Sequence, residues 1–290
     1  MQTDTCLLNG QAFHLRRWGH PDLPPLLMLH GFPEYSGAWE DLAPLLADRF
    51  HCVAPDQRGY GQSYAPAGVE AYRISQLVSD MAALIDQLGG QVILMGHDWG
   101  ASVAYALAAR HPEKVSRLIV ANGVHPVPFQ RELAKGEAQS EASQYINGLR
   151  QEGIEEALEH NNYRQVIRTL HMDTDMSWMS HARRADYIEA WSQGGGRLGT
   201  MINWYRASPL QVADPGTPLT DLPDMPVDQL RITCPHLLIW GMKDTALLPC
   251  STEGLEEFAP DLTRVEIAEA DHWICHQVPD QVAAIIRDWV

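Results

Sequence analysis

Residues 92–101 read VILMGHDWGA, and this stretch carries the strongest indication of a fold in the chain. Its first four residues are apolar, as in a strand that is buried on both faces of a sheet. Residues 99–110 then place apolar side chains at helical spacing. Between strand and helix stands Asp98, with Gly96 and Gly100 two residues to either side. A carboxylate in this place either caps the helix or performs chemistry.

Short apolar runs alternate with segments of helical spacing through much of the chain. This alternation is typical of a mostly parallel sheet with helices on both faces. The predicted strands are residues 12–17, 25–29, 51–54, 92–95, 117–121, 236–240 and 263–267. The predicted helices beside them are residues 75–88, 99–110 and 281–289.

Between residues 125 and 230 the alternation stops, and no strong strand pattern is present. Helical patches take its place, followed by a proline-rich connector; the patches are 141–150, 154–160 and 183–192. We therefore expect one core built from residues 1–124 and 231–290, with a helical insertion at 125–230.

The charge of the chain excludes several classes of partner. Its 290 residues include 21 basic and 37 acidic side chains, for a formal net charge of −16. Such a charge repels nucleic acids and anionic membrane surfaces, so we expect neither as a partner. No apolar stretch reaches the roughly 18 residues that span a membrane, and the N-terminus shows no secretory signal pattern. We expect a cytoplasmic protein.

The cysteines indicate neither a disulfide framework nor a zinc site. They are five in number, scattered, and without CxxC spacing. This pattern favours free thiols, and the sequence predicts no bound metal. It does not determine whether the chain forms a homo-oligomer.

The pattern G-x-D-x-G around Asp98 stands at the junction of a predicted strand and a predicted helix. In hydrolases with the pattern G-x-S-x-G, the nucleophile occupies this position, and the tight turn requires glycines around it. Aspartate in place of serine predicts a carboxylate nucleophile. The alternative is an ordinary N-cap for the helix that begins at Trp99.

A second loop, LHGFPE at residues 29–34, follows another predicted strand. A backbone N–H in this loop, that of Phe32, is placed to form an oxyanion hole with the N–H of Trp99. The alternative is a Gly-Pro turn with no further role.

Two more polar residues, Asp244 and His272, each follow a predicted strand near the end of the chain. The order nucleophile, acid, histidine is the one found in hydrolases built on such a sheet. Asp271 is the alternative acid, but the side chains of neighbouring residues diverge, which favours Asp244. Asn122 follows another strand and is not ionisable, so it removes a rival position for the acid.

Together these segments resemble the α/β-hydrolase fold and, within it, the group of epoxide hydrolases and haloalkane dehalogenases. HGFPE, DQRGYGQS, GHDWGA, WGMKD and ADHW occur in the family's order across nearly the whole chain. The resemblance implies a mostly parallel eight-stranded sheet flanked by helices, with residues 125–230 as a helical cap domain. It also implies supporting roles for residues of the two oxyanion loops: His30, Gly31, Pro33, Gly96, His97 and Gly100.

A carboxylate nucleophile suits attack on saturated carbon, because it needs no deprotonation. The resemblance implies that Asp98 attacks an epoxide carbon and forms a covalent alkyl ester. His272, oriented by Asp244, would then activate a water that hydrolyses this ester. The oxyanion hole would serve the second step, and no cofactor is required.

The oxygen that leaves the epoxide carbon needs a proton donor, and the resemblance implies two tyrosines in the cap. NWYR resembles the family segment that holds one of them, which indicates Tyr205. The spacing to Gly153 indicates Tyr145 as the other. A phenol can donate a proton to a departing alkoxide. Tyr163 and Tyr187 are less well placed alternatives.

Two other functions compete with epoxide hydrolysis. A haloalkane or haloacid dehalogenase would use the same aspartyl ester. Haloalkane dehalogenases commonly hold the halide with an asparagine where Phe32 stands, and fluoroacetate dehalogenases carry arginines where Trp99 and Ser102 stand. A non-catalytic small-molecule receptor often lacks catalytic groups that this chain retains. We therefore expect an epoxide hydrolase acting on a small hydrophobic molecule.

Overall fold

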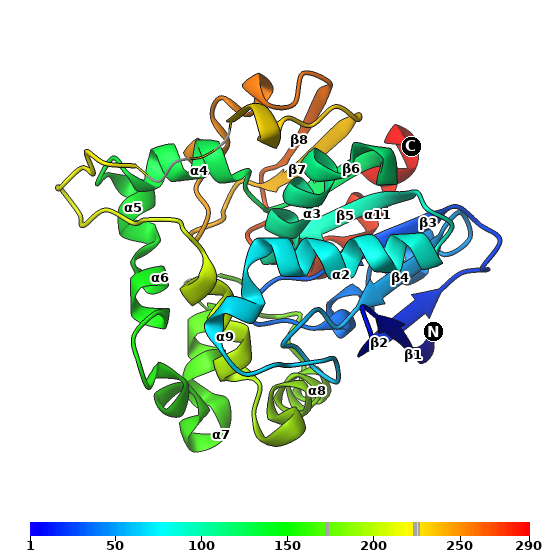
Figure 1. Ribbon diagram of the computed structural model, residues 1–290, viewed down its shortest axis with the longest axis horizontal. Helices are drawn as coiled ribbons and strands as arrows, with labels where there is room; N and C mark the ends of the chain where they lie inside the picture. The colour runs from blue at the N-terminus through cyan, green and yellow to red at the C-terminus, as the bar shows by residue number, and fades with distance from the viewer. Residues whose placement is uncertain (172–173, 223–224, 226) are drawn as a thin grey trace.

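The computed structural model describes residues 1–290 except 172–173, 223–224 and 226. Its centre is one eight-stranded sheet in the order β1-β2-β4-β3-β5-β6-β7-β8 (Figure 1). The strands are β1 (Gln2–Leu8), β2 (Gln11–Trp18), β3 (Pro25–Leu29), β4 (His51–Pro55), β5 (Val92–His97), β6 (Val115–Ala121), β7 (His236–Gly241) and β8 (Leu262–Ile267). β2 pairs antiparallel with β1 and β4, and every other pairing is parallel. The predicted mostly parallel eight-stranded sheet is confirmed.

The sequence pattern did not indicate the first strand, β1. Most of its side chains are exposed, so no buried apolar run marks it. The turn between β1 and β2 is Asn9-Gly10, with φ angles of 51° and 78°. Two-residue hairpin turns with positive φ favour the dipeptide Asn-Gly. This dipeptide is the local signal that identifies the hairpin.

Hydrophobic cores cover both faces of the sheet. Helices α2 (Ile74–Gln87) and α3 (Trp99–Arg110) pack into one core, and α1 (Ala43–Leu46) and α11 (Pro279–Trp289) pack into the other. Figure 1 shows α2 and α3 in front of the sheet and α11 behind it. Within β5, Leu94 belongs to the first core, whereas Ile93 and Met95 belong to the second. Successive side chains of a strand point to opposite faces, so burial on both faces explains the continuous apolar run.

Between β6 and β7 lies the part of the chain that we call the helical segment, residues 122–235. Its helices are α4 (Pro126–Leu133), α5 (Ala138–Ala142), α6 (Gln144–Leu149), α7 (Ile154–His171), α8 (His181–Ser192) and α9 (Leu198–Ala207). Figure 1 shows α5 to α9 gathered beyond one end of the sheet, away from both chain termini. The sequence pattern indicated parts of α5 to α8 but missed α4 and α9.

Some features are absent from the residues that the structure describes. None of their helices is long and apolar enough to cross a membrane. No group of three His, Cys, Asp or Glu side chains among them is arranged to hold a metal ion. All five cysteines of the chain are free.

The junction of β5 and α3 is a strained and crowded turn. Asp98 has φ 50° and ψ −122°, a conformation that non-glycine residues rarely adopt. A Cβ atom on Gly100 would overlap the carbonyl oxygen of Leu29, and one on Gly96 would lie 2.6 Å from the backbone of Ala101. The glycines therefore allow neighbouring backbone to pack against the turn, which holds Asp98 at the carboxyl end of β5.

Replacing Gly100 with alanine should strongly destabilise the fold. A backbone carbonyl cannot easily move away from the added methyl group, so we expect the free energy of unfolding to fall by about 1–3 kcal/mol or more. The matched change Gly199→Ala adds a methyl group to α9 in nearly open space. It should raise the free energy of unfolding by up to about 1 kcal/mol. Urea denaturation measures both changes, and equal effects would contradict the role of crowding at the turn.

Candidate active site

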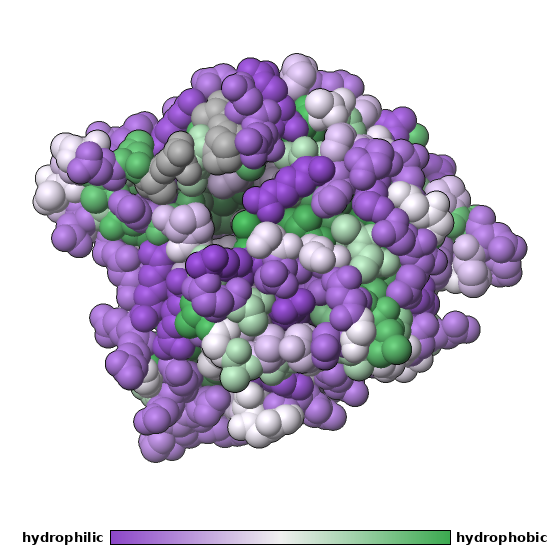
Figure 2. All heavy atoms as spheres, viewed as in Figure 1, coloured by the Kyte–Doolittle hydropathy of each residue, from purple (hydrophilic) through white to green (hydrophobic). Residues whose placement is uncertain are grey.

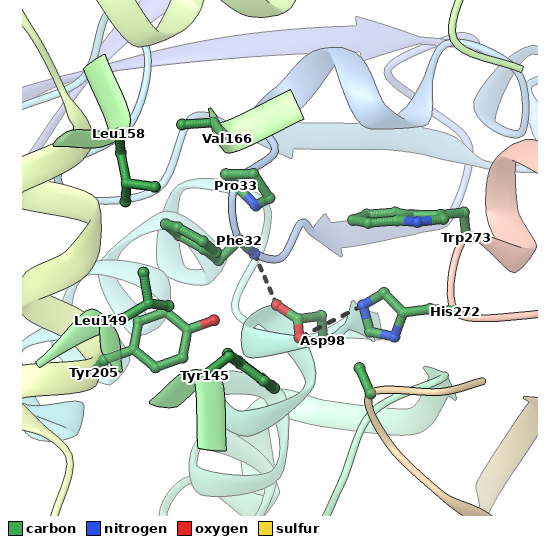
Figure 3. Close-up of a pocket in the computed structure, with 11 residues that line it drawn as sticks. Phe32, Pro33, Asp98, Tyr145, Leu149, Leu158, Val166, Tyr205, His272 and Trp273 are labelled. Carbon is green, nitrogen blue, oxygen red and sulfur yellow. Dashed lines mark hydrogen bonds and ion pairs between the residues drawn. The ribbon is translucent and has the colours of Figure 1, made fainter. Parts of the chain in front are cut away.

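A pocket lies at the carboxyl end of β5, between the sheet and the helical segment (Figure 3). Its lining residues are Phe32, Pro33, Asp98, Tyr145, Leu149, Leu158, Val166, Tyr205, Ala246, His272 and Trp273. Four of the five residues predicted to be catalytic, Asp98, Tyr145, Tyr205 and His272, are among them. The fifth, Asp244, contacts His272 and does not line the pocket.

Asp98, His272 and Asp244 form a row of charged groups. The Nδ1 atom of His272 is 2.8 Å from Oδ2 of Asp244. Its Nε2 atom is 3.7 Å from Oδ2 of Asp98. Asp271, the alternative acid, instead accepts hydrogen bonds from two backbone N–H groups. The structure therefore places Asp244, and not Asp271, against the histidine.

Asp244 is buried, and hydrogen bonds hold both of its carboxylate oxygens. Oδ1 accepts from the backbone N–H groups of Ala246 and Leu247 at 2.9 and 2.8 Å. Burial alone would raise the pKa of this carboxyl group. The charge and hydrogen bond of His272, together with the other donors, outweigh burial and lower the pKa. Asp244 is thus ionised and fixed in orientation.

Asn122 holds Asp244 from the other side. Its side-chain amide donates to Oδ2 of Asp244 at 2.8 Å, and its Oδ1 accepts from the N–H of Gly241 at 2.7 Å. From its sequence position alone, Asn122 is only a non-ionisable residue at a rival position for the acid. In the structure, Asn122 joins the end of β6 to the loop that carries Asp244. The residues next to it in the sequence give no indication of this contact.

His272 is buried between two carboxylates. Burial alone would lower its pKa, because it disfavours the charged imidazolium. The charge and hydrogen bond of Asp244, followed by the charges of Asp98 and Glu34, outweigh burial and raise the pKa to about 9. At neutral pH the resting protein therefore carries a protonated His272 between Asp98 and Asp244.

The N–H of Phe32 donates to Oδ1 of Asp98 at 2.7 Å. Trp99 is the first residue of α3, so its N–H is among the groups that lack a partner within the helix. Next to Phe32, the side chain of Asp98 occupies the space that a Cβ atom on Gly31 would need. One of the two N–H groups predicted for the oxyanion hole thus contacts the carboxyl group of the predicted nucleophile.

His30 and His97 hold backbone segments around the pocket. Nδ1 of His30 lies 2.9 Å from the carbonyl oxygen of Gly31, and its Nε2 accepts from the N–H of Gln57. Nε2 of His97 lies 2.8 Å from the carbonyl oxygen of His272. His97 therefore contacts the loop that carries His272, in addition to lying in the turn that carries Asp98. The carbonyl of Pro33 accepts from the indole of a tryptophan in α8 at 2.6 Å.

A buried carboxylate to which the sequence analysis assigned no role, that of Glu34, lies behind His97. One of its oxygens is 3.0 Å from Nδ1 of His97, and the other is 2.8 Å from Nε2 of His276. Burial alone would raise the pKa of Glu34, but the two histidines hold it well below its usual range. The hydroxyl of Tyr187 donates to the same carboxylate at 3.2 Å. Tyr187, one alternative ring-opening tyrosine, is engaged here and does not line the pocket.

The rings of Tyr145 and Tyr205 face each other edge to face, with centroids 6.2 Å apart. Tyr205 also makes edge contacts with Phe32 and Trp99 at 5.1 and 5.0 Å. In Figure 3 the phenol oxygen of Tyr205 points toward the part of the pocket that holds Asp98. Burial, with the negative charge of Asp98, raises the pKa of both phenols. Both are therefore neutral hydrogen-bond donors.

Two further cavities continue from this pocket. The nearer one shares Asp98, Tyr145 and Tyr205 with it. The farther one shares Trp99 and Phe129 with the nearer one. The three cavities therefore lie in a row that begins at the predicted nucleophile.

The farther cavity has a largely apolar lining, contributed by α2, α3, α4, α9 and the chain that follows α9. Along α3 the lining side chains are Trp99, Ser102, Ala106 and Arg110, spaced about one turn apart. Figure 2 shows the surface hollowed between α3 and α4, with hydrophobic residues in the hollow. The row of cavities thus extends from Asp98 toward this face.

Comparison with known proteins identifies the family. Residues 24–279 match the family model for the alpha/beta hydrolase fold. The AB hydrolase superfamily protein YfhM of Bacillus subtilis (strain 168) is 33% identical over 285 residues, which cover 97% of this chain and 95% of that protein.

Solved structures agree. One reported among novel epoxide hydrolases of the alpha/beta hydrolases superfamily, from metagenomes of hot environments, is 36% identical with a TM-score of 0.88, over 100% of this chain and 98% of that chain. The epoxide hydrolase of Bacillus megaterium in complex with an inhibitor is 30% identical with a TM-score of 0.87, over 99% of both chains. The chain therefore belongs to the α/β-hydrolase fold family, as an epoxide hydrolase-like member.

Proposed function

We propose that this protein hydrolyses an epoxide to a vicinal diol through a covalent ester on Asp98. The observation that carries the proposal is the shared pocket, where Asp98 and His272 lie opposite two neutral phenols. A carboxylate can attack the epoxide carbon while the phenols of Tyr145 and Tyr205 bind the epoxide oxygen. The names of the solved relatives support this function as well.

In the first step, Asp98 opens the epoxide ring. The N–H of Phe32 holds Oδ1, so we assign the attack to Oδ2. A bond forms between Oδ2 and the epoxide carbon, and the bond from that carbon to the epoxide oxygen breaks. One phenol passes its proton to the departing oxygen, and the other donates a hydrogen bond to it. The product of this step is a hydroxyalkyl ester and a phenolate.

Ester formation also prepares His272 for the second step. The ester has no negative charge, so one of the charges that raise the pKa of His272 disappears. The imidazolium then releases a proton, which restores the phenol. Neutral His272, oriented by Asp244, can now accept a proton from water.

In the second step, the activated water attacks the carbonyl carbon of the ester. The N–H groups of Phe32 and Trp99 stabilise the negative oxygen of the tetrahedral intermediate. When the intermediate collapses, the bond between the carbonyl carbon and Oδ2 breaks, and the second proton of the water passes to Oδ2. The diol leaves with Oδ2 as its new hydroxyl oxygen, Asp98 is again a carboxylate, and His272 is again protonated.

We propose that the helical segment acts as a cap that supplies the phenols and encloses a hydrophobic substrate. Tyr145 lies on α6 and Tyr205 on α9, whereas Asp98, Asp244 and His272 lie at the ends of strands of the sheet. The pocket and the farther cavity are lined mostly by apolar side chains. Such lining favours an apolar substrate.

The origin of the new hydroxyl oxygen tests the covalent ester. A single turnover in water enriched in heavy oxygen should give an unlabelled diol, because the new oxygen comes from Asp98. Mass spectrometry should find the label in the peptide that contains Asp98. Asp98→Asn is the control and should release no diol. A labelled diol after one turnover would contradict the ester, and free halide from organohalogens with inert epoxides would favour a dehalogenase.

Removing either phenol should slow ring opening but not ester hydrolysis. We expect Tyr205→Phe and Tyr145→Phe each to lower the rate of ester formation by about a hundredfold or more, as loss of a general acid does. Stopped-flow tryptophan fluorescence in single turnovers separates the two steps, since Trp273 lines the pocket. The control Tyr163→Phe should change neither rate more than about twofold. Normal ester formation in both test variants would exclude the phenols.

The ionisation of His272 should depend on Asp98. Because its pKa of about 9 lies above the ordinary value of 6.5, the proton stabilises the fold fully below about pH 6.5, and this stabilisation is lost as the pH rises through about 9. Asp98→Asn removes a raising charge, so the pKa should fall. NMR titration of the imidazole measures both values, with Asp41→Asn as a control that should leave the pKa near 9. An unchanged pKa in Asp98→Asn would refute the coupling.

A further inference from the structure

Arg150 joins the two helices that carry the phenols. It follows directly after α6, the helix of Tyr145. Its Nε atom donates to the carbonyl oxygen of Tyr205 at 2.9 Å, and a terminal guanidinium nitrogen donates to the carbonyl oxygen of Ser208 at 3.2 Å. Both carbonyls belong to the C-terminal end of α9. One side chain therefore ties the end of one phenol-bearing helix to the end of the other.

The charge of Arg150 suits this position. The last carbonyls of a helix lack donors within the helix and form the negative end of its dipole. Burial lowers the pKa of the guanidinium, yet an arginine keeps its charge in proteins. Among the described residues Arg150 forms no ion pair, and its side-chain hydrogen bonds go to these two carbonyls. Its rigid fork presents separate nitrogens to the two carbonyls, whereas the ammonium of a lysine is a single point charge on a flexible stem.

The position of Tyr145 depends on hydrogen bonds between its helix and neighbouring elements more than the position of Tyr205 does. Tyr205 is packed between Phe32 and Trp99 of the core loops. Tyr145 lies on a helix of only six residues, which needs contacts with its surroundings to form. The side chain of Gln144 anchors the start of α6 to the carbonyl of residue 213 at 2.9 Å. Arg150 anchors its end, directly to the backbone of Tyr205.

We propose that Arg150 is a positioning residue, which sets the distance between the two phenols and so determines the rate of ring opening. This inference rests on the proposed function. The phenols act only in the first step, whereas His272 and Asp244, neither of which contacts Arg150, act in the second. Loss of Arg150 should therefore affect one step selectively. A residue that merely stabilised the fold would show no such selectivity.

The test variant is Arg150→Met, which keeps an apolar stem of similar length and loses both donors. The matched control is Arg206→Met. Arg206 also lies on α9 and joins it to a neighbouring element, through the carboxylate of Glu155 at 2.8 Å and the carbonyl of Gln151 at 2.7 Å. It makes none of the contacts between α6 and the carbonyl of Tyr205.

Single-turnover stopped-flow fluorescence with an epoxide that the wild-type protein hydrolyses gives both rates. In Arg150→Met we expect ester formation to slow by about ten- to a hundredfold, the effect of a displacement of about 1 Å in a reacting group. Ester hydrolysis should stay within about twofold of wild type. In Arg206→Met the melting temperature should fall while both rates stay within about twofold.

A double-mutant cycle tests whether Arg150 acts through the phenols. In a protein that already carries Tyr145→Phe, adding Arg150→Met should slow ester formation by less than about threefold. If the full effect persists in that background, Arg150 acts on the substrate directly and the proposal is wrong. Equal slowing of both steps, or unchanged ester formation in Arg150→Met, would also overturn it.

If Arg150→Met does not fold, Arg150→Lys keeps the charge but places all its N–H donors on a single nitrogen, and it should still slow ester formation more than ester hydrolysis. Equal effects on the two steps in Arg150→Lys would overturn the proposal. A wrong proposed function would give a different experimental result. In that case the wild-type protein itself forms no ester on Asp98 with any epoxide.

Discussion

The rest of the site is arranged around one carboxylate, that of Asp98, which the fold places at the mouth of a buried strand. A strained turn between β5 and α3 holds this residue, and glycines on both sides leave room for the crowded backbone. The N–H of Phe32 holds one carboxylate oxygen, and protonated His272 faces the other. These contacts offset the cost of placing a charge where little water reaches it. They also aim the carboxylate into the pocket.

The site divides its tasks between two parts of the chain. The loops at the ends of strands supply charged groups, and polar partners from other loops hold them, as Asn122 holds Asp244 and Asp244 holds His272. The helical segment supplies neutral groups, the phenols of Tyr145 and Tyr205, whose burial keeps them protonated. The charged groups thus lie just beyond the ends of strands of the sheet. The neutral donors stand on short helices whose placement depends on tertiary contacts such as those of Arg150.

Local sequence predicted the elements whose pattern is complete within a few residues. The apolar runs of β3 to β7 and the glycines around Asp98 are such patterns, and the predicted strands match the observed ones closely. α9 was missed, although its NWYR motif pointed to Tyr205. Hydrophobic periodicity does not predict β1, because most of its side chains are exposed. The Asn9-Gly10 dipeptide that follows β1 does indicate a hairpin, because two-residue hairpin turns favour Asn-Gly.

The sequence by itself determined the strands β2 to β8, the turn that bears Asp98, and the chain order of carboxylate, acid and histidine, because these follow from local patterns and short motifs. Only the tertiary structure decided which acid faces His272, which histidines contact the buried carboxylate of Glu34, and what joins the helices of the two phenols. Each of these depends on a hydrogen bond between residues far apart in the chain. Such a bond produces no pattern in the sequence near either partner, so the pairing can be seen only in the folded structure.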